Sequence, residues 1–224
     1  MVNSVNNFEN LNTFLYKQIK DMVWEKKLMP GDKIIQEQLA ADLGVSRTPL
    51  IKVLERLTSE RLIEYIPRRG YFVKKLTLEE MIEIFKVREV VEGVAVKEVA
   101  DKATEKQIEE LKGIFSKFDI DMCVELKNEY IEADQKFHSR LIEIADIQLI
   151  EDINEMFNIY RFSYQKGLMR DPSETIQEHQ AILDKIEDHD SRAAQLLIMD
   201  HIEISSHSIS KIFQEKYNDD GTLK

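Results

Sequence analysis

One stretch of the chain constrains its fold more than any other: residues 43–57, LGVSRTPLIKVLERL. Gly44 permits the unusual backbone angles that a tight corner between two helices needs. Ser46 is a good helix N-cap, and Pro49 falls in the first turn, where a missing amide proton costs little. The stretch therefore predicts a turn followed by a helix, whose buried face recurs at i, i+3, i+4 and i+7 and consists of Leu50, Val53, Leu54 and Leu57.

The outer side of that helix carries Arg47, Thr48 and Ile51 close to its N-terminus, and Lys52 follows. This is the end at which a helix docked in the major groove of DNA touches base edges and phosphates. Arginine can form two hydrogen bonds to guanine, whereas isoleucine can only pack against a thymine methyl group. The helix is therefore a candidate for sequence recognition in DNA.

The preceding segments predict two more helices. Residues 11–27 have helical periodicity, which Pro30 and Gly31 end, and residues 35–42 predict a short helix with Leu39 and Ala40 turned inward. The buried stripe expected for the first helix consists of Leu11, Phe14, Leu15, Ile19, Met22 and Val23.

The following segment, residues 62–76, predicts a β-hairpin, because two β-rich runs are joined through Pro67, Arg68, Arg69 and Gly70. Adjacent arginines at such a tip can lie along phosphates or enter a narrow minor groove. An ordinary helix pair or a solvated hairpin would explain each element alone. Their order favours a winged helix-turn-helix over residues 1–76.

Charge supports a division of the chain. The formal net charge is −11 for all 224 residues, but residues 11–76 hold 13 Lys and Arg against 8 Asp and Glu. That segment is therefore mildly basic and the remainder strongly acidic, as expected for a chain that touches nucleic acid with one part only. Chance segregation of charge is the alternative.

The fold is expected to be mainly α, since 7 Gly and 4 Pro leave little room for the many turns of an all-β protein. Cys123 is the single cysteine, and neither a secretion signal nor a run of about twenty apolar residues is present. We therefore expect a soluble, cytoplasmic protein. The second domain, residues 77–224, is expected to be an all-α bundle of six helices near 78–102, 104–119, 122–145, 147–169, 173–189 and 191–217.

Four residues of this second domain have the chemistry of a metal site. Asp134 and His138 are four apart, so both side chains leave one helix face and can share an ion. His179 and His201 lie on two later helices, each amid apolar periodicity. Three imidazoles and a carboxylate would suit a divalent transition metal with open positions for water or a ligand carboxylate. The alternative for each histidine is an ordinary core or surface position, which we expect for His189 and His207.

Residues 11–75 resemble a known family. The segments LAADLGVSRTPLIKVLERL and ERLIEYIPRRGYFV are similar to the winged-helix domain of the GntR family of bacterial transcription regulators. The resemblance implies DNA contacts by Arg47 and Thr48 and by the wing residues Arg68, Arg69 and Gly70. Ile51 and Lys52 stand where this family usually has arginine and glutamate, so the usual family operator is not expected unchanged.

The second domain resembles the FCD domain of the FadR branch of that family, through IFKVREVVEGVAVKEVA, EADQKFHSRL, EHQAIL and DHDSRAAQLLIMDHI. Six helices resemble the VanR-like subgroup. The resemblance implies that Asp134, His138, His179 and His201 bind a metal such as zinc, nickel or manganese. It also implies that a small carboxylate effector binds beside the metal.

Arg88 is the leading candidate for holding that effector, with Arg161 and Arg170 as weaker ones. Arg88 lies in a helix that is apolar on most sides, and a buried guanidinium needs an anionic partner. A modest surface pair with Glu92, four residues later, is the alternative.

Together these features predict a homodimeric, ligand-responsive transcription regulator, in the commoner case a repressor, whose two heads bind a palindromic operator. It is not expected to be an enzyme. The alternatives are a metal sensor without an organic effector and a metal-dependent enzyme with an accessory DNA-binding domain. No general base or phosphate-binding glycine loop supports the enzyme.

Overall fold

The computed structural model describes residues 2–25, 27–151, 153–154 and 170–216. The chain divides into two compact units that meet between Leu76 and Thr77. Within the described residues, no helix is both long and apolar enough to span a membrane.

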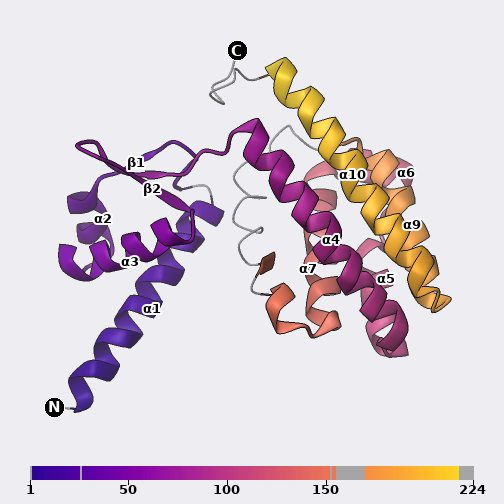
Figure 1. Cartoon of the computed structure of the whole chain (residues 1–224), viewed down its shortest axis with the longest axis horizontal. Coiled ribbons are helices and arrows are strands. Elements are labelled where there is room, and N and C mark those ends of the chain that lie inside the picture. Colours follow the sequence, from indigo (N-terminus) through magenta and orange to yellow (C-terminus); the bar gives the residue numbers. More distant parts are fainter. Residues whose placement is uncertain (1, 26, 152, 155–169, 217–224) are drawn as a thin grey trace. The chain divides into compact units, whose positions relative to one another are not determined.

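The first unit contains three helices and a three-stranded antiparallel sheet in the order β1-β3-β2 (Figure 1). Strand β1 pairs with β3 and was not predicted, because two residues are too few to show a period. The elements are α1 (Val2–Trp24), β1 (Lys33–Ile34), α2 (Gln36–Asp42), α3 (Arg47–Ser59), β2 (Ile63–Ile66) and β3 (Gly70–Val73).

The predicted helix-turn-helix is present. Gly44 has a positive φ of 66°, and the corner is closed by a hydrogen bond of 2.9 Å from the Val45 amide to the Ala40 carbonyl. Ser46 occupies the N-cap position of α3, but its side chain makes no capping hydrogen bond. The predicted inner face of α3 forms the centre of the core, with Leu50, Val53, Leu54 and Leu57 all buried.

Phe14 was predicted to lie on the buried face of α1, and this prediction was wrong. Leu15, Ile19 and Val23 are buried, whereas Phe14 is 54% exposed. Successive helix residues differ by about 100° in direction, so Phe14 points well away from the arc that Leu15 and Ile19 share.

The wing is the β2–β3 hairpin, with Ile63 opposite Val73 and Ile66 opposite Gly70. A hydrogen bond of 3.0 Å from the Arg69 amide to the Ile66 carbonyl closes its turn. Gly70 has a φ of 98°, a conformation that L side chains rarely adopt.

The second unit is a helical bundle, as predicted (Figure 1). A Thr77–Glu80 capping box begins α4, and Asp171 caps α9 with Pro172 in its first turn. The helices are α4 (Leu78–Lys102), α5 (Glu105–Phe115), α6 (Ile120–Glu125), α7 (Lys127–Ala145), α9 (Pro172–Glu187) and α10 (Ser191–Lys216).

Three predicted boundaries in this unit were wrong or lie partly outside the described residues. The helix predicted over 104–119 ends at Phe115, and the one over 122–145 is interrupted at Leu126, whose φ of −99° and ψ of 41° separate α6 from α7. Of the helix predicted over 147–169, residues 148–151 and 153–154 are helical and the rest lie outside the description.

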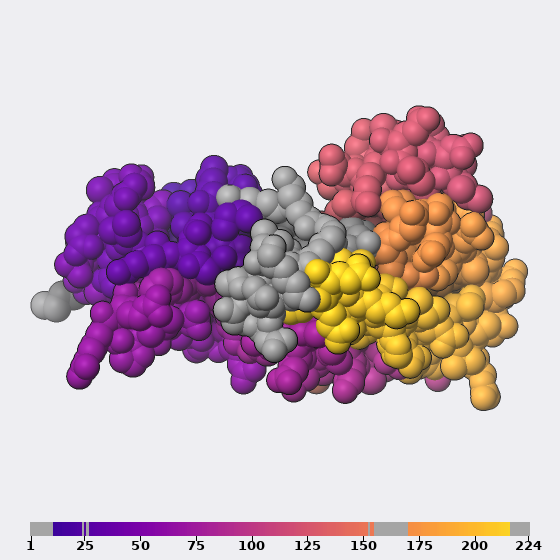
Figure 2. Space-filling model, turned by 90° about the horizontal axis from the view of Figure 1, so that it is seen from above, coloured from indigo at the N-terminus to yellow at the C-terminus, as the bar shows by residue number. Residues whose placement is uncertain are grey.

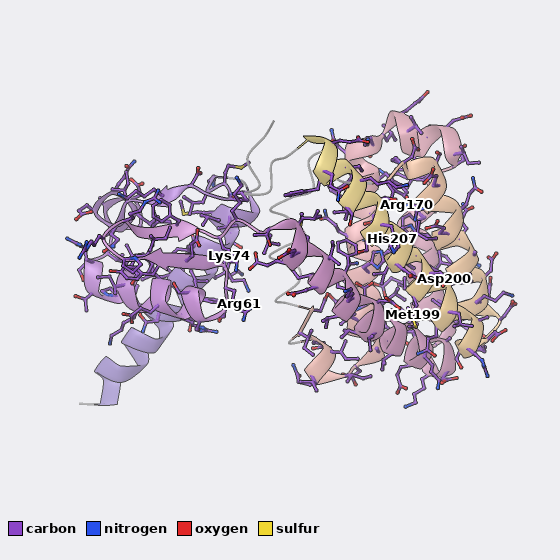
Figure 3. The ribbon with its side chains drawn as sticks, turned by 45° about the horizontal axis from the view of Figure 1, so that its top comes forward. Arg61, Lys74, Arg170, Met199, Asp200 and His207 are labelled. Atoms are coloured by element: carbon purple, nitrogen blue, oxygen red, sulfur yellow. The ribbon has the colours of Figure 1, made fainter. Side chains whose placement is uncertain are left out.

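The long helices α4 and α10 lie side by side (Figure 1). At Gly93 an added Cβ would lie 2.9 Å from Met199 Cγ on α10, and Met199 is labelled in Figure 3. Part of α10 also lies on the molecular surface (yellow in Figure 2). The core of this unit includes Tyr130 and Phe137 of α7, which are fully buried.

Candidate metal centre and DNA-binding surface

The bundle brings together the four residues that the sequence singled out. Asp134 and His138 come from α7, His179 from α9 and His201 from α10, and one ligand atom from each lies within 4.8 Å of all the others. All four residues are buried. His179 Nε2 is 3.4 Å and His138 Nε2 is 3.9 Å from Asp134 Oδ1.

The helix patterns explain why these polar groups face inward. On α7, Asp134 and His138 lie on the same face as the buried Tyr130 and Leu141. The neighbours of His179 and His201 are buried aliphatic residues: Ile176, Ile182, Leu183, Ile198 and Ile202. The four polar residues are therefore buried because they share helix faces with apolar residues that pack in the core.

His138 is held from behind by a carboxylate. Its Nδ1 is hydrogen-bonded to Glu92 Oε2, and the other oxygen of Glu92 accepts a 2.7 Å bond from Arg88 Nε. Arg88 is 5% exposed and Glu92 is 1% exposed. Arg88 is therefore buried with an anionic partner, and that partner is Glu92. The pair is not the surface pair considered as the alternative, because α4 packs against both α7 and α10.

His201 has a parallel arrangement. Its Nδ1 lies 2.6 Å from Glu178 Oε2, and Arg170 donates two bonds of 2.6 Å to the two oxygens of Glu178. Burial alone would raise the pKa of Glu178, but the hydrogen bonds from His201 and Arg170 outweigh it and lower the pKa to about 2. Glu178 is therefore a carboxylate at neutral pH.

His179 is held by a neutral chain instead. Its Nδ1 lies 3.0 Å from the Tyr130 hydroxyl, which is 2.9 Å from Thr175 Oγ1. Burial and the nearby Asp134 carboxylate raise the pKa of Tyr130, so the phenol keeps its proton. Tyr130 can therefore accept from His179 while donating to Thr175, which in turn can donate to the Pro172 carbonyl at 3.3 Å.

These outer partners decide what the cluster can do. A carboxylate only accepts hydrogen bonds, so the ring proton of His138 and of His201 lies on Nδ1. Each ring then presents the lone pair of Nε2, the form in which imidazole binds a metal. Donor atoms on one ion lie about 3–4 Å apart when bonds are about 2.0–2.2 Å long. The separations of His179 Nε2 and His138 Nε2 from Asp134 Oδ1, 3.4 and 3.9 Å, fall in this range. The donor set suits a divalent transition metal.

The remaining candidates of the bundle do not join the cluster. His189 donates from Nδ1 to the Ala100 carbonyl at 2.7 Å. The side chain of His207, labelled in Figure 3, is 75% exposed. Arg170 is occupied with Glu178. Arg161 lies outside the described residues.

The predicted DNA-contacting residues lie on the surface of the first unit. Arg47, Thr48 and Lys52 are exposed on α3, whereas Ile51 is half-buried. At the tip of the wing, Arg68 and Arg69 are exposed and Gly70 is half-buried. In the free protein, Arg47 pairs with Glu37 at 2.9 Å and donates a 3.3 Å hydrogen bond to Gln36 Oε1.

Sequence reasoning missed three residues that complete the centre, namely Tyr130, Glu178 and the inward role of Glu92. The only signals were the i, i+4 spacing of Arg88 and Glu92 and the position of Glu178 next to His179. Neither signal identifies the histidine that each glutamate reaches. Those partners lie on other helices.

A winged helix-turn-helix joined to a helical bundle with a buried ligand cluster defines a DNA-binding transcription regulator rather than an enzyme. The matched families agree. Residues 11–73 match the bacterial regulatory proteins of the gntR family, and residues 83–204 match the FCD domain. The chain belongs to the GntR family, with an FCD domain following its winged helix.

Relatives and solved structures are consistent with this membership. The chain is 28% identical over 212 residues to the HTH-type transcriptional regulator YdhC of Bacillus subtilis, covering 89% of this chain and 91% of that protein. It is 23% identical to the HTH-type transcriptional repressor RspR of Escherichia coli, covering 94% of each. A GntR regulator from Rhodococcus sp. RHA1 shares the fold, with a TM-score of 0.73 at 20% identity over 89% of this chain and 97% of that one.

Proposed function

We propose that this regulator binds a divalent transition metal through Asp134, His138, His179 and His201 and responds to a small organic acid bound at the open positions of that metal. The observation that carries the proposal is the convergence of one ligand atom from each of the four residues within 4.8 Å of the others, while Nδ1 of all three histidines is hydrogen-bonded to an outer partner. When bound, the metal would supply positive charge for a carboxylate ligand. Zinc, nickel and manganese are the candidates.

Arg88 is the proposed partner of the acid. Its bond to Glu92 uses Nε–H, and a guanidinium has four further N–H donors on its terminal nitrogens, which match a carboxylate in a forked geometry. The Arg88 guanidinium also lies 4.9 Å from the centre of the Phe85 ring, which helps to hold its orientation. Arg161 remains a weaker prediction.

We further propose that the protein acts in the cytoplasm as a homodimeric repressor, with residues 1–76 binding the operator and residues 77–224 binding the effector and the second copy. One exposed stripe of α4 supports dimerisation, because Val87, Val90 and Val94 are 47%, 57% and 43% exposed. These three residues share one helix face. Two recognition helices from a dimer would bind two half-sites of a palindrome. The relative RspR is named a repressor.

The test has three measurements on the full chain. Native mass spectrometry would show which metal and which acid co-purify with the dimer. Metal and candidate carboxylates would then be titrated separately against affinity for an operator. A response to metal alone would favour a metal sensor over an acid-responsive regulator, and an unchanged response after chelation would contradict the role of the metal.

A further inference from the structure

Helix α4 supplies none of the four proposed metal ligands, yet it reaches the centre through one side chain. Glu92 lies in the middle of α4 and accepts hydrogen bonds from His138 at one carboxylate oxygen and from Arg88 at the other. It is 1% exposed. We propose that Glu92 is a positioning residue that transmits metal binding to α4, the helix directly after the DNA-binding unit. This inference rests on the metal site proposed above.

Glu178 and Tyr130, the hydrogen-bond partners of the other two histidines, come from helices that already supply a proposed ligand. Glu178 holds His201 from α9, which already contains His179, and Tyr130 holds His179 from α7, which already contains His138. Among these three partners, only Glu92 connects a ligand to a helix without ligands. The loss of Glu92 therefore removes a link that the loss of Glu178 leaves in place.

The proposed transmission depends on the His138 ring, which would be restrained at both of its nitrogens. An ion at Nε2 of His138 fixes the imidazole, whose Nδ1 then fixes the carboxylate of Glu92. Both oxygens of Glu92 are engaged, so its side chain has little freedom to absorb a shift of the ring. Metal binding thus restrains the middle of α4.

Helix α4 is suited to carry that restraint toward the DNA-binding unit. It is continuous from Leu78, and Thr77 caps it immediately after the first unit ends at Leu76. Glu92 lies 15 residues beyond Thr77, which corresponds to about 22 Å along a helix. A helix of this length behaves as a stiff rod, so a change at Glu92 reaches the start of α4.

A competing route exists through packing. Gly93 lies against Met199, and Met199 is two residues before the ligand His201 on α10 (Figure 3). If the α4–α10 contact carried the response, substitution of Glu92 would weaken metal binding without changing the response at saturation. The two routes therefore make different predictions.

The experiment compares Glu92→Gln with Glu178→Gln as its matched control, using zinc as the probe. Each change removes one carboxylate from the Nδ1 of a histidine, and each should lower zinc affinity by roughly 10–100-fold. Operator affinity is then measured with and without saturating zinc, on a duplex selected from random DNA by the wild-type protein. We expect Glu178→Gln to retain the wild-type response and Glu92→Gln to lose it.

A second variant is needed because Glu92→Gln leaves Arg88 as an uncompensated buried charge and could prevent folding. The double change Arg88→Met and Glu92→Met replaces the whole ion pair with apolar side chains of similar size. We expect it to bind zinc more weakly and to show no zinc-dependent operator response. Hydrogen exchange of residues 78–102 gives an independent measure, since zinc should slow it in the wild type and in Glu178→Gln but not without Glu92.

A full operator response in both variants at saturating zinc would overturn the inference. Zinc binding to the wild type without any change in α4 exchange would overturn it as well, while the proposed metal site would stand. If zinc, nickel and manganese all fail to bind the wild type, the proposed function fails first and the inference fails with it.

Discussion

The winged-helix unit and the helical bundle differ in where their candidate functional residues lie: those of the winged-helix unit are mostly exposed, and those of the bundle are buried. In the first unit, the core is built from aliphatic residues such as Leu15, Leu50 and Leu54, and the charged residues expected to meet DNA are exposed. In the second unit, the residues of the proposed metal site and their hydrogen-bond partners Arg88, Glu92 and Tyr130 are buried in the bundle. Every buried polar or charged residue among those described belongs to the bundle.

The difference fits the ligand proposed for each unit, which is DNA for the first and a metal ion for the second. A polyanion as large as DNA is met by an outer surface, where arginine and lysine stay hydrated until they contact phosphate. A single ion gains most from a dry site whose ligands are already oriented, and orientation requires buried partners such as Glu92 and Glu178. Substitutions in the two units should therefore have different consequences, which the following predictions test.

The largest expected effect is that of His138→Ala. It removes one of the four ligands, so zinc affinity should fall by more than the roughly 100-fold expected for an outer partner. The measurement is competition for zinc with a chromophoric chelator. His207→Ala on the exposed part of α10 is the control and should leave zinc affinity unchanged; equal losses in the two variants would contradict the assigned site.

Arg47→Ala should remove sequence-specific DNA binding while leaving zinc affinity unchanged. Loss of one bidentate base contact costs about 1–3 kcal/mol of discrimination between the correct base and the others. Footprinting and competition with random DNA would measure this loss. An unaltered footprint would show that α3 does not read DNA through Arg47.

Gly93→Ala should lower the free energy of unfolding of the bundle by about 1–3 kcal/mol, as expected when a packed core must accept an extra carbon. The added Cβ would meet Met199 Cγ at 2.9 Å. Denaturant titration of the bundle signal gives the value. Gly113→Ala on α5, where no atom lies within 4 Å, is the control and should cause no loss; a similar loss there would remove the argument from packing.

The smallest expected effect is that of Lys52→Ala. Loss of one phosphate contact should weaken binding to all DNA sequences alike and reduce the slope of log affinity against log salt by about one. Titrations at several salt concentrations would measure the slope for specific and random duplexes. A change confined to the specific duplex would instead make Lys52 a base-reading residue.

Much of the fold was predictable because it depends on local patterns. The positive φ at Gly44, the buried face of α3 and the wing turn before Gly70 follow from short-range spacing and backbone chemistry. Two features of the helices were predicted wrongly. Phe14 is exposed because its direction differs by about 100° from that of Leu15. The break at Leu126 was missed because no glycine or proline marks it in the sequence.

The metal cluster was predictable only as a set of residue types. The i, i+4 pair on α7 is local, so the common direction of Asp134 and His138 could be stated from the sequence. The convergence of His179 and His201 on that pair required the packing of α9 and α10. The roles of Glu92 and Glu178 could not be predicted, because each reaches a histidine on another helix.

The sequence by itself determined the mainly α architecture, the order of the winged-helix elements and the exposed positions of Arg47 and Lys52. It did so because helix periodicity, glycine turns and surface charge are properties of neighbouring residues. Only the tertiary structure decided which nitrogen of each histidine faces the proposed ion and that α4 is linked to it through Glu92. Those properties depend on hydrogen bonds between residues as far apart as 49 positions in the chain, and no local pattern specifies them.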